Sequence, residues 1–260
     1  MASKTFEWRP AKLLQDYNIG QDFALLILNQ PLKNGVNLRK LWKNSSVRVA
    51  ADGGANRLHK LSSFHGKYSN LQLIIGDLDS LTPTVRDFYS SQPSPAQIIR
   101  DADQNSTDFA KAVNWIRNEH PDGIDIVALG GIGGRVDQGL SQLHHLYLFQ
   151  TDPEYASGRV FLLSGSSLTF LLKPGTHQIQ VREDGEEDAF GKHIGIIPLK
   201  EAANITTKGF EWDVEDWHTE IGGKLSTSNH ILPDSQVVTV TTDKDVLFTV
   251  ALKEGDGDDE

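Results

Sequence analysis

The stretch VRVAADGGANRLHKL (residues 47–61) decides the fold class. It passes from a short apolar run (47–51) through an Asp-Gly-Gly turn into a segment with helical spacing (55–61). A buried strand that ends in turn residues and leads into a helix is the βα unit of a parallel sheet. The stretch therefore predicts an α/β fold with a mainly parallel sheet.

The same alternation continues on both sides of this stretch. Apolar runs that end in turn residues lie at 23–28, 71–75, 97–99 and 124–129, and segments with helical spacing lie at 106–116 and 138–149. We therefore expect an N-terminal α/β domain over residues 21–152, preceded by an extension over residues 1–20. Because ligands of parallel sheets bind beyond the carboxyl ends of the strands, we expect the site there.

The chain changes in texture after about residue 152. Short strand-like segments replace the helical ones, and they lie at 160–163, 169–172, 177–181, 193–198, 204–207 and 224–226. The alternating stretch VVTVTTDKDVLFTVAL (237–252) predicts two further strands joined as a hairpin at 243–245. We therefore expect an all-β sandwich domain at the C-terminal end, over residues 155–252, followed by an acidic tail over 253–260.

Composition excludes several classes of protein. The 260 residues contain no cysteine, which excludes disulfides, zinc–thiolate sites and a thiol nucleophile. The formal net charge is −10, but ten of the 35 acidic residues lie in two runs, within 183–188 and 254–260. Without these ten and the neighbouring Arg182 and Lys253, 23 basic residues remain against 25 acidic ones. No electropositive surface for nucleic acid is therefore expected.

Nothing in the sequence predicts insertion into a membrane. The longest strongly apolar run, 23–28, is far shorter than the roughly 20 residues that a membrane helix needs. The segment MASKTFEWRP (1–10) lacks the apolar core of a signal peptide. We therefore expect no membrane segment and a cytoplasmic location.

Four short segments place carboxylates and glycines at the ends of expected strands. They are ADGGANR (51–57), GDLDS (76–80), DQNSTD (103–108) and GGIGGRVDQ (130–138). Asp77 and Asp79 form an Asp-x-Asp pair, and two such charges raise the pKa of one carboxyl unless a cation lies between them. Mg²⁺ is commonly held by a few carboxylates and the phosphates of a substrate, so the pair favours a magnesium site.

Other interpretations stay open for individual positions. Taken alone, the position of Asp52 after a strand favours its interpretation as a turn former or helix N-cap. Asp108 fits the first turn of a helix, where its charge favours the helix dipole, as well as it fits a binding site. His144 and His145 lie within an apolar helical segment and are interpreted as packing or surface residues, not as metal ligands.

The glycine segment 130–138 is the most informative of the four. Its four glycines allow backbone N–H groups to approach an anion closely, and the helix expected after it presents its positive end. Arg135 adds a forked donor for phosphate oxygens. Together the four segments favour metal-assisted chemistry on the phosphates of a nucleotide. Mg²⁺ is a requirement of this interpretation, because the carboxylates would otherwise repel the substrate.

The motifs of several other enzyme classes are absent. The chain has no GxxxxGK[ST] phosphate loop, no GxGxxG with its ribose-binding acid, no GxSxG elbow and no HExxH. The sequence therefore disfavours P-loop NTPases, dinucleotide-binding enzymes, serine hydrolases and zinc proteases. The signature set of protein kinases is absent as well.

Seven segments, in order along nearly the whole chain, resemble the thiamine pyrophosphokinase (thiamine diphosphokinase) family. They are ADGGANRL (51–58), IIGDLDS (74–80), DQNSTDF (103–109), GGIGGRVDQ (130–138), KGFEWDV (208–214), LSTSN (225–229) and VVTVTTDKDVLFTVAL (237–252). The resemblance implies an α/β nucleotide-binding catalytic domain, a thiamine-binding β-sandwich, and a homodimer whose active sites are shared between subunits. It implies Mg²⁺-dependent transfer of the diphosphoryl group of ATP to the thiamine hydroxyl, giving thiamine diphosphate and AMP.

The resemblance also implies roles for residues of the α/β domain. The acidic set that holds Mg²⁺ and orients the phosphates is matched by Asp77, Asp79, Asp108 and Asp137. Arg135 resembles a phosphate clamp and joins these four acids as a catalytic group. Positions that match the ATP site are Asp52, Asn56, Arg57, Thr107, Arg135 and Gln138. Either Asp77 or Asp108 is a candidate for accepting the proton of the hydroxyl.

For thiamine, the resemblance implies binding by Gln104, Trp212, Ser226, Ser228 and Asn229. The thiazolium ring of thiamine is a permanent cation, so the face of Trp212 offers stacking and cation–π attraction. Its spacing alone would instead favour the interpretation that Trp212 is an aromatic residue of the core. The hydroxyl groups within LSTSN fit turns at a strand end equally well.

Two other functions are compatible with the sequence. One is a different Mg²⁺-dependent nucleotide phosphotransferase or hydrolase on the same scaffold, which would form ADP or release phosphate. The other is a non-catalytic thiamine-binding module, which would keep Trp212 but lose members of the acidic set, and all four acids are present. The acidic insertion at 182–192 and the acidic tail depart from the compact family pattern, and their role stays open.

Overall fold

A computed structural model describes residues 4–16, 21–32, 35–65 and 67–253, with the backbone alone for 62–65. Contacts divide the chain into two compact units. Unit 1 comprises Met1–Gln21 and Ser166–Glu260, and unit 2 comprises Asp22–Gly165. Each unit is described by itself.

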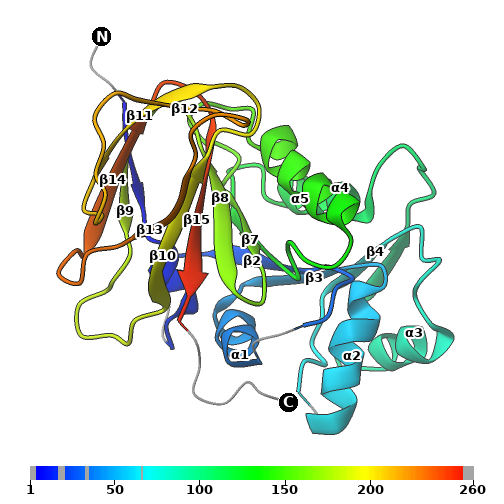
Figure 1. Ribbon diagram of the computed structural model, residues 1–260. Coiled ribbons are helices and arrows are strands. Elements are labelled where there is room, and N and C mark those ends of the chain that lie inside the picture. Colours follow the sequence, from blue (N-terminus) through cyan, green and yellow to red (C-terminus); the bar gives the residue numbers. More distant parts are fainter. Residues whose placement is uncertain (1–3, 17–20, 33–34, 66, 254–260) are drawn as a thin grey trace. The chain divides into compact units, whose positions relative to one another are not determined.

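Unit 2 is a parallel sheet covered by helices on both faces. The strand order is β7-β6-β2-β3-β4-β5, and each neighbouring pair is parallel. The strands are β2 (Phe23–Ile27), β3 (Val47–Ala51), β4 (Leu73–Gly76), β5 (Gln97–Arg100), β6 (Asp125–Leu129) and β7 (Val160–Leu163). The helices are α1 (Gly35–Asn44), α2 (Gly54–His65), α3 (Pro83–Ser90), α4 (Asp108–Glu119) and α5 (Val136–Phe149). Helices α4 and α5 lie on one face of the sheet, and α1 and α2 lie on the other (Figure 1).

The sequence of the central strands explains this layering. All five residues of β2, FALLI, are buried, as are the last four of β6. A strand that is covered on both faces has no solvent side, so its apolar residues run continuously and do not alternate. The α/β fold predicted from the βα pattern is confirmed for this unit.

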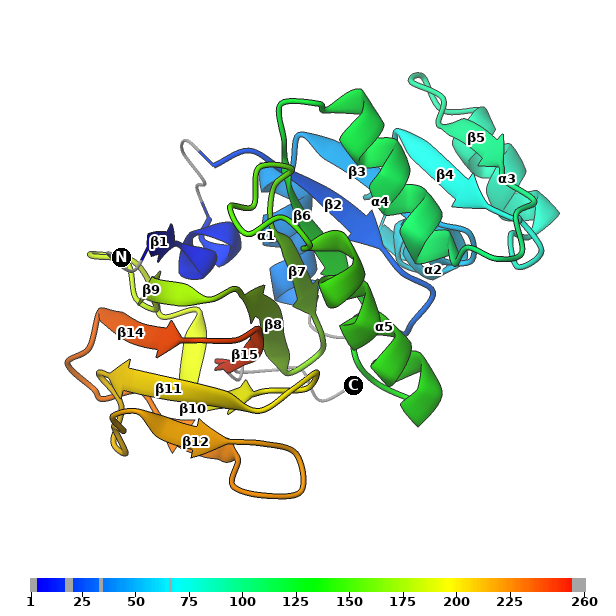
Figure 2. The ribbon, with the colours of Figure 1, turned by 90° about the horizontal axis from the view of Figure 1, so that it is seen from above.

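Unit 1 is a two-sheet β structure (Figure 2). One sheet has the order β1-β9-β14-β11-β12, and the strands β13-β10-β15-β8 lie side by side in the other. The strands are β1 (Thr5–Trp8), β8 (Ser167–Leu172), β9 (Gly175–Gln180), β10 (Phe190–Ile197), β11 (Ala203–Lys208), β12 (Trp217–Thr219), β13 (Ser226–His230), β14 (Val237–Thr242) and β15 (Val246–Leu252). Neighbouring strands are antiparallel except β1 and β9, which are parallel.

The limits of the units differ from the expected ones at two places. The segment 160–163, expected in the sandwich, forms β7 and pairs in parallel with β6 of unit 2. Its four residues are all buried, as suits a strand inside a helix-covered sheet. The expected extension 1–20 contains β1 and a 3₁₀ helix (Pro10–Leu14), and both belong to unit 1.

Trp8 explains why the N-terminal segment belongs to the sandwich. Its ring is 1% exposed and stacks on Phe170 of β8 with a centroid distance of 4.6 Å. Its indole Nε1–H donates to Nδ1 of His177 at 2.9 Å, while His177 Nε2 lies 2.7 Å from the carbonyl oxygen of Lys173. The indole of β1 therefore packs against β8 of the second sheet and is hydrogen-bonded to β9 of its own.

The expected hairpin at 243–245 is wrong. Strand β14 pairs with β9 and β11, whereas β15 pairs with β10 and β8, so the two strands lie in different sheets. Both strands alternate toward a common core, and Val238 and Phe248 are fully buried. Alternation predicts which side chains are buried, but it does not distinguish a hairpin from a turn that crosses between two layers.

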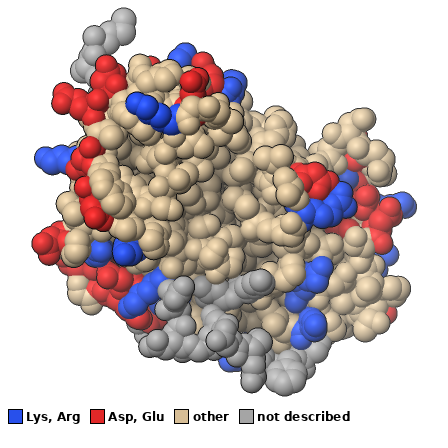
Figure 3. Space-filling model, in the orientation of Figure 1, with Lys and Arg blue, Asp and Glu red and all other residues tan. Residues whose placement is uncertain are grey.

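Charged residues of both signs are mixed on one face of the protein. On the face shown in Figure 3, Lys and Arg of the described residues are interspersed with Asp and Glu. Within the described ranges, no helix combines the length and the apolar character that crossing a membrane requires.

We expect Trp8→Ala to lower the free energy of unfolding by about 3–5 kcal/mol, because it removes a buried indole and leaves His177 Nδ1 without its donor. Denaturant unfolding followed by circular dichroism measures the change. Glu7→Ala, on the exposed face of the same strand, is the matched control. Equal stability of the two variants would contradict the place of β1 in the core of unit 1.

Candidate active site

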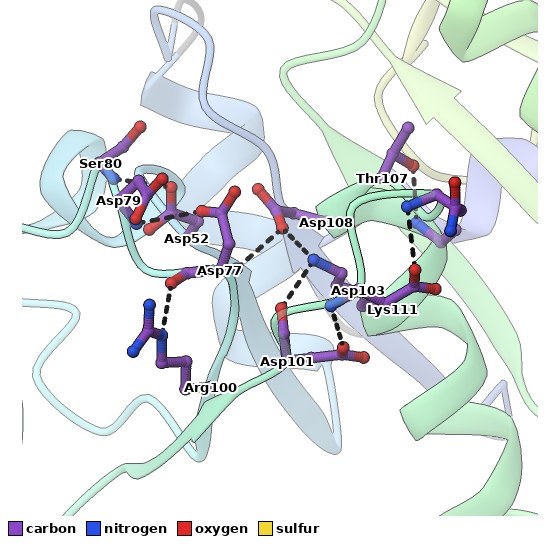
Figure 4. Close-up of polar contacts among 12 residues, drawn as sticks. Asp52, Asp77, Asp79, Ser80, Arg100, Asp101, Asp103, Thr107, Asp108 and Lys111 are labelled. Atoms are coloured by element: carbon purple, nitrogen blue, oxygen red, sulfur yellow. Dashed lines mark hydrogen bonds and ion pairs between the residues drawn. The ribbon is translucent and has the colours of Figure 1, made fainter.

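Three carboxylates converge at the carboxyl edge of the unit 2 sheet. Strands β3 and β4 are neighbours, and they end immediately before Asp52 and Asp77. Asp108 begins α4, which packs over the same two strands. One carboxylate oxygen from each of the three residues lies within 4.8 Å of the others (Figure 4).

The backbone around these acids is unusual. Asp52 has a φ of 39° and Leu78, the residue after Asp77, has a φ of 65°. Left-handed φ values are rare for residues other than glycine, and they concentrate at functional sites. A side chain at Gly76 would place its Cβ 2.8 Å from Asp108 Oδ1 and equally close to Asp52 Cβ. Glycine is therefore required for the three acids to approach each other.

Backbone N–H groups orient the carboxylates. Ser80 N–H donates to Asp52 Oδ2 at 3.1 Å, and Asp79 N–H donates to Asp77 Oδ1 at 3.0 Å. Asp108 Oδ1 accepts from the N–H of Asp77 at 3.2 Å. These bonds fix the carboxylate groups before any ligand binds.

A buried ammonium group stands beside the cluster. The side chain of Lys111 is 2% exposed, and its Nζ lies 3.4 Å from Asp108 Oδ1 and donates to the carbonyl oxygen of Asp101 at 2.8 Å. Burial raises the pKa of Asp108, and the negative charge of Asp77 raises it further. The N–H of Asp77 and the charge of Lys111 act in the opposite direction.

The cluster fits a divalent cation. Asp52 is 4% exposed, and its Oδ1 is buried without a hydrogen-bond partner among the described residues. A buried acceptor without a partner costs about 1–3 kcal/mol, which a bound cation would offset. Carboxylate oxygens are the ligands of hard cations such as Mg²⁺, so the donor set, its spacing and the unpaired oxygen agree.

A cavity of about 270 Å³ adjoins the cluster. Its lining includes Asp77 and Asp108 of the cluster, together with Thr107, Gln138 and His145. Its other lining residues are Leu28, Asn29, Gln30, Ala51, Ser106, Phe109, Ser141 and Gln142. A cavity with an acidic edge makes this the candidate active site.

Sequence reasoning missed Asn29, Gln30 and His145. Asn29 and Gln30 follow β2, the central strand, so the rule that ligands lie beyond strand ends would have found them. His145 was interpreted as a packing or surface residue. It is 3% exposed and lines the cavity, and burial lowers the pKa of its imidazole.

Asp79 and Asp137 lie outside the group of three converging acids. Asp79 is exposed. Asp137 forms an exposed bidentate ion pair with Arg135. Arg135 Nε donates to Asp137 Oδ1 at 3.1 Å, and Nη2 donates to Oδ2 at 2.6 Å. The hydrogen bond from Arg135 lowers the pKa of the Asp137 carboxyl. For Asp137 the separation follows from sheet order, because its segment comes after β6, and β2 lies between β6 and β3.

Other sequence-predicted positions have structural partners. Asn56 Nδ2 donates to the carbonyl oxygen of Ser80 at 2.6 Å, and its Oδ1 accepts from the N–H of Thr82. Arg57 Nε donates to Asn29 Oδ1 at 3.0 Å. Asn56 and Arg57 line a second cavity of about 700 Å³, whereas Gln104 is exposed and lines neither cavity.

In unit 1, the predicted thiamine residues separate into two kinds. Trp212 is 54% exposed, so it is not the core residue that its spacing favours. Asn229 is 5% exposed: its Oδ1 accepts from the N–H of Trp212 at 3.2 Å, and its Nδ2 donates to Trp212 O at 2.9 Å. Asn229 therefore holds the turn that carries Trp212. Ser228 is exposed and Ser226 is half-buried on β13.

Comparisons with known proteins agree with each other. Residues 38–156 match the family model of the thiamin pyrophosphokinase catalytic domain, and residues 176–247 match that of the thiamin pyrophosphokinase vitamin B1 binding domain. Thiamine pyrophosphokinase 3 of Oryza sativa subsp. japonica is 35% identical, over 90% of this chain and 88% of its own length. The Saccharomyces cerevisiae thiamine pyrophosphokinase is 29% identical, over 90% of this chain and 87% of its own.

Solved structures give the same result. The crystal structure of yeast thiamin pyrophosphokinase matches with a TM-score of 0.82 and 27% identity, over 95% of this chain and 91% of that one. Thiamin pyrophosphokinase from Candida albicans matches with a TM-score of 0.79 and 27% identity, over 95% and 93%.

We expect Asp52→Asn to raise the dissociation constant for Mn²⁺, a probe for Mg²⁺, by roughly ten-fold or more, because ligand charge sets affinity for hard cations. Isothermal titration calorimetry measures the constant. Asp87→Asn, an exposed acid on α3, is the control that removes the same charge elsewhere in unit 2. An unchanged constant in Asp52→Asn would sink the assignment of the three-acid cluster as a cation site.

Proposed function

The chain belongs to the thiamine pyrophosphokinase family, and we propose that the acidic cluster of unit 2 is where it transfers the diphosphoryl group of ATP to thiamine. The enzyme is thus a transferase of the kinase type. The family assignment does not favour a different phosphotransferase, a hydrolase or a non-catalytic binding module.

One observation carries the assignment of the site. Three carboxylates converge within 4.8 Å, and one of their oxygens, Asp52 Oδ1, is buried and unpaired. Such an arrangement is unfavourable by itself, because like charges repel and the buried acceptor lacks a hydrogen bond. A divalent cation held by the three acids would offset both costs, and the phosphates of a nucleoside triphosphate would offer it further oxygen ligands.

We propose that Asp52, Asp77 and Asp108 hold Mg²⁺ together with the phosphates of ATP. When bound, the cation supplies positive charge against the charge that develops on the transferred phosphates. Asp79 and Asp137 belong to the proposed set on the family resemblance, and their exposure leaves them accessible to a bound nucleotide.

The reaction is a displacement at the β-phosphorus of ATP. The hydroxyethyl oxygen of thiamine forms a bond to that phosphorus, the bond to the oxygen that bridges to the α-phosphorus breaks, and AMP leaves. The hydroxyl proton passes to a carboxylate, and Asp77 and Asp108 are the candidates beside the cavity. Thus each thiamine converted yields one thiamine diphosphate and one AMP.

Residues around the cavity are proposed to position the nucleotide. Arg135 has its forked donors on Asp137 at the surface, and the same fork fits phosphate oxygens. Thr107 and Gln138 line the cavity beside the cluster. Asn56 and Arg57 line the larger cavity of unit 2, which we propose for other parts of ATP.

Thiamine is proposed to bind on Trp212 of unit 1. An exposed indole offers a flat face to a cationic ring, and Asn229 fixes the backbone that carries it. Ser226 and Ser228 on β13, and the exposed Gln104 of unit 2, are the proposed polar contacts.

We propose a homodimer in which the acidic cluster of one subunit works with the partner's Trp212. Three apolar residues on α5 are well exposed: Val136 at 78%, Leu140 at 53% and Leu148 at 47%. Their spacing in multiples of four places them along one side of the helix. Exposed apolar surface of this kind is typical of protein interfaces, which supports the proposal.

Phosphorus NMR of the protein with ATP, Mg²⁺ and thiamine tests the reaction. We expect thiamine diphosphate and AMP to appear in equal amounts, and neither to form without thiamine. ADP with thiamine monophosphate, or phosphate release that ignores thiamine, would overturn diphosphoryl transfer.

We expect Trp212→Ala to raise the KM for thiamine by about two- to thirty-fold, the equivalent of ~0.5–2 kcal/mol of lost cation–π attraction. The KM for ATP should stay near that of the wild type. Trp212→Phe keeps an aromatic face and should show a smaller rise. Steady-state kinetics with each substrate varied in turn decides the point, and an unchanged thiamine KM would exclude stacking on this residue.

The same variant tests the sharing of sites. Asp77→Asn and Trp212→Ala chains, mixed and allowed to exchange subunits, should regain about a quarter of wild-type activity at low thiamine. Half of the dimers are then mixed, and each has one site with both residues intact. No gain above the separate variants would show that both residues act within one chain.

A further inference from the structure

We propose that His145 is a positioning residue: its imidazole, fixed on α5, holds the hydroxyl of Thr107 and thereby sets the start of α4 that carries Asp108. This inference deepens the proposed function and rests on it for the role of Asp108. It concerns two side chains in the wall of the 270 Å³ cavity.

The imidazole is held from several sides. His145 is 3% exposed and stacks on Phe109 of α4, with ring centroids 4.8 Å apart and planes 26° apart. Phe149 and His144 contact it at centroid distances of 5.7 Å and 5.6 Å. A ring confined in this way presents its two nitrogens in fixed directions.

The hydrogen bonds define which nitrogen carries the proton. His145 Nδ1 faces the carbonyl oxygen of Ser141, which only accepts, so Nδ1 is the donor. In the neutral ring Nε2 is then an acceptor. It lies 2.7 Å from Thr107 Oγ1, and the hydroxyl of Thr107 therefore donates to it.

Thr107 passes this constraint to α4. Its Oγ1 accepts from the N–H of Ala110 at 3.1 Å, which makes Thr107 the N-cap of the helix. The hydroxyl thus donates to α5 and accepts from α4 at the same time. Asp108, the next residue, accepts from the N–H of Asp77 with its Oδ1. A chain of bonds therefore leads from His145 to the acidic cluster.

The same side of α5 also holds the glycine-rich loop. Gln142, three residues before His145, accepts a hydrogen bond from the N–H of Ile132 through its Oε1. Ile132 has a φ of 29°, a left-handed value that needs support from its surroundings. Helix α5 therefore holds both the glycine-rich loop, through Gln142, and the start of α4, through His145.

A purely structural role for His145 makes a different prediction. If the ring only fills space against Phe109, then His145→Phe keeps most of its packing and leaves the site intact. If the Nε2 acceptor matters, then His145→Phe and Thr107→Val remove the same bond from its two ends. Their effects on the site would then coincide and not multiply.

The experiment is a double-mutant cycle over His145→Phe, Thr107→Val and the double variant. Steady-state kinetics measures kcat and KM, and calorimetry with Mn²⁺ measures cation affinity without turnover. We expect each single variant to lower kcat and Mn²⁺ affinity by about ten-fold, and the double variant to lose no more than either single one. Thr107→Ser keeps the hydroxyl and should recover most of what Thr107→Val loses.

His120→Phe is the matched control, because it makes the same change at the C-cap of α4, the opposite end of the helix from Thr107, and should leave kinetics and Mn²⁺ affinity unchanged. Wild-type values in His145→Phe, or effects that multiply in the double variant, would overturn the proposal. If His145→Phe fails to fold, then Thr107→Val, which removes the same hydrogen bond, still tests the proposal. Wild-type protein that makes no thiamine diphosphate would refute the proposed function, while the Mn²⁺ cycle would still decide the coupling.

Discussion

Unit 2 is organised around the charge of three carboxylates held within 4.8 Å of one another. In open solution these groups would separate, so the fold must offset their repulsion. It does so with the backbone N–H groups of Ser80, Asp79 and Asp77, which donate to the carboxylates of Asp52, Asp77 and Asp108 in turn, and with the buried ammonium of Lys111. Three negative charges and one positive charge leave two uncompensated, which is the charge of one divalent cation. The unpaired Oδ1 of Asp52 leads to the same conclusion from hydrogen bonding.

The order of the strands in the sheet decides which acidic residues come together in the cluster. The acids after β3 and β4 are adjacent because the strands are adjacent, and α4 brings Asp108 back over them after β5. The glycine-rich loop follows β6 on the far side of β2, and the cavity lies between these two groups with Asn29 and Gln30 in its lining. Residues of α5, the helix that follows this loop, and two acids of the cluster therefore line one cavity. That is the arrangement expected where the phosphates of a nucleotide are bound between a cation and N–H donors.

The sequence predicted the layered α/β unit well, because a strand buried on both faces and a turn rich in Asp and Gly are local signals. It also predicted carboxylates at the carboxyl edge of the sheet, where Asp52, Asp77 and Asp108 converge. The membership of the three-acid cluster could not be predicted, since Asp52 looks like a turn former until β3 and β4 are known to be neighbours. The predictions of a hairpin at 243–245 and of a separate N-terminal extension were wrong for a related reason. Both depend on long-range pairing, β15 with β10 and β1 with β9, and alternation within one strand carries no information about its partner.

Motif residues also divide into those that offer atoms to a ligand and those that hold them in place, and only the structure separates the two. Asn229 lies in the same motif as Ser228, yet its amide is committed to the backbone of Trp212. Gln142 is buried, and its Oε1 accepts from the N–H of Ile132 in the glycine-rich loop. His145 is a further example, and it lies in no motif. A buried side chain whose donors and acceptors are already paired has none left for a substrate, and its effect on catalysis must pass through the residue it holds. Helix α5 shows why such residues matter, because one of its faces fixes two loops that share no hydrogen bond among those described.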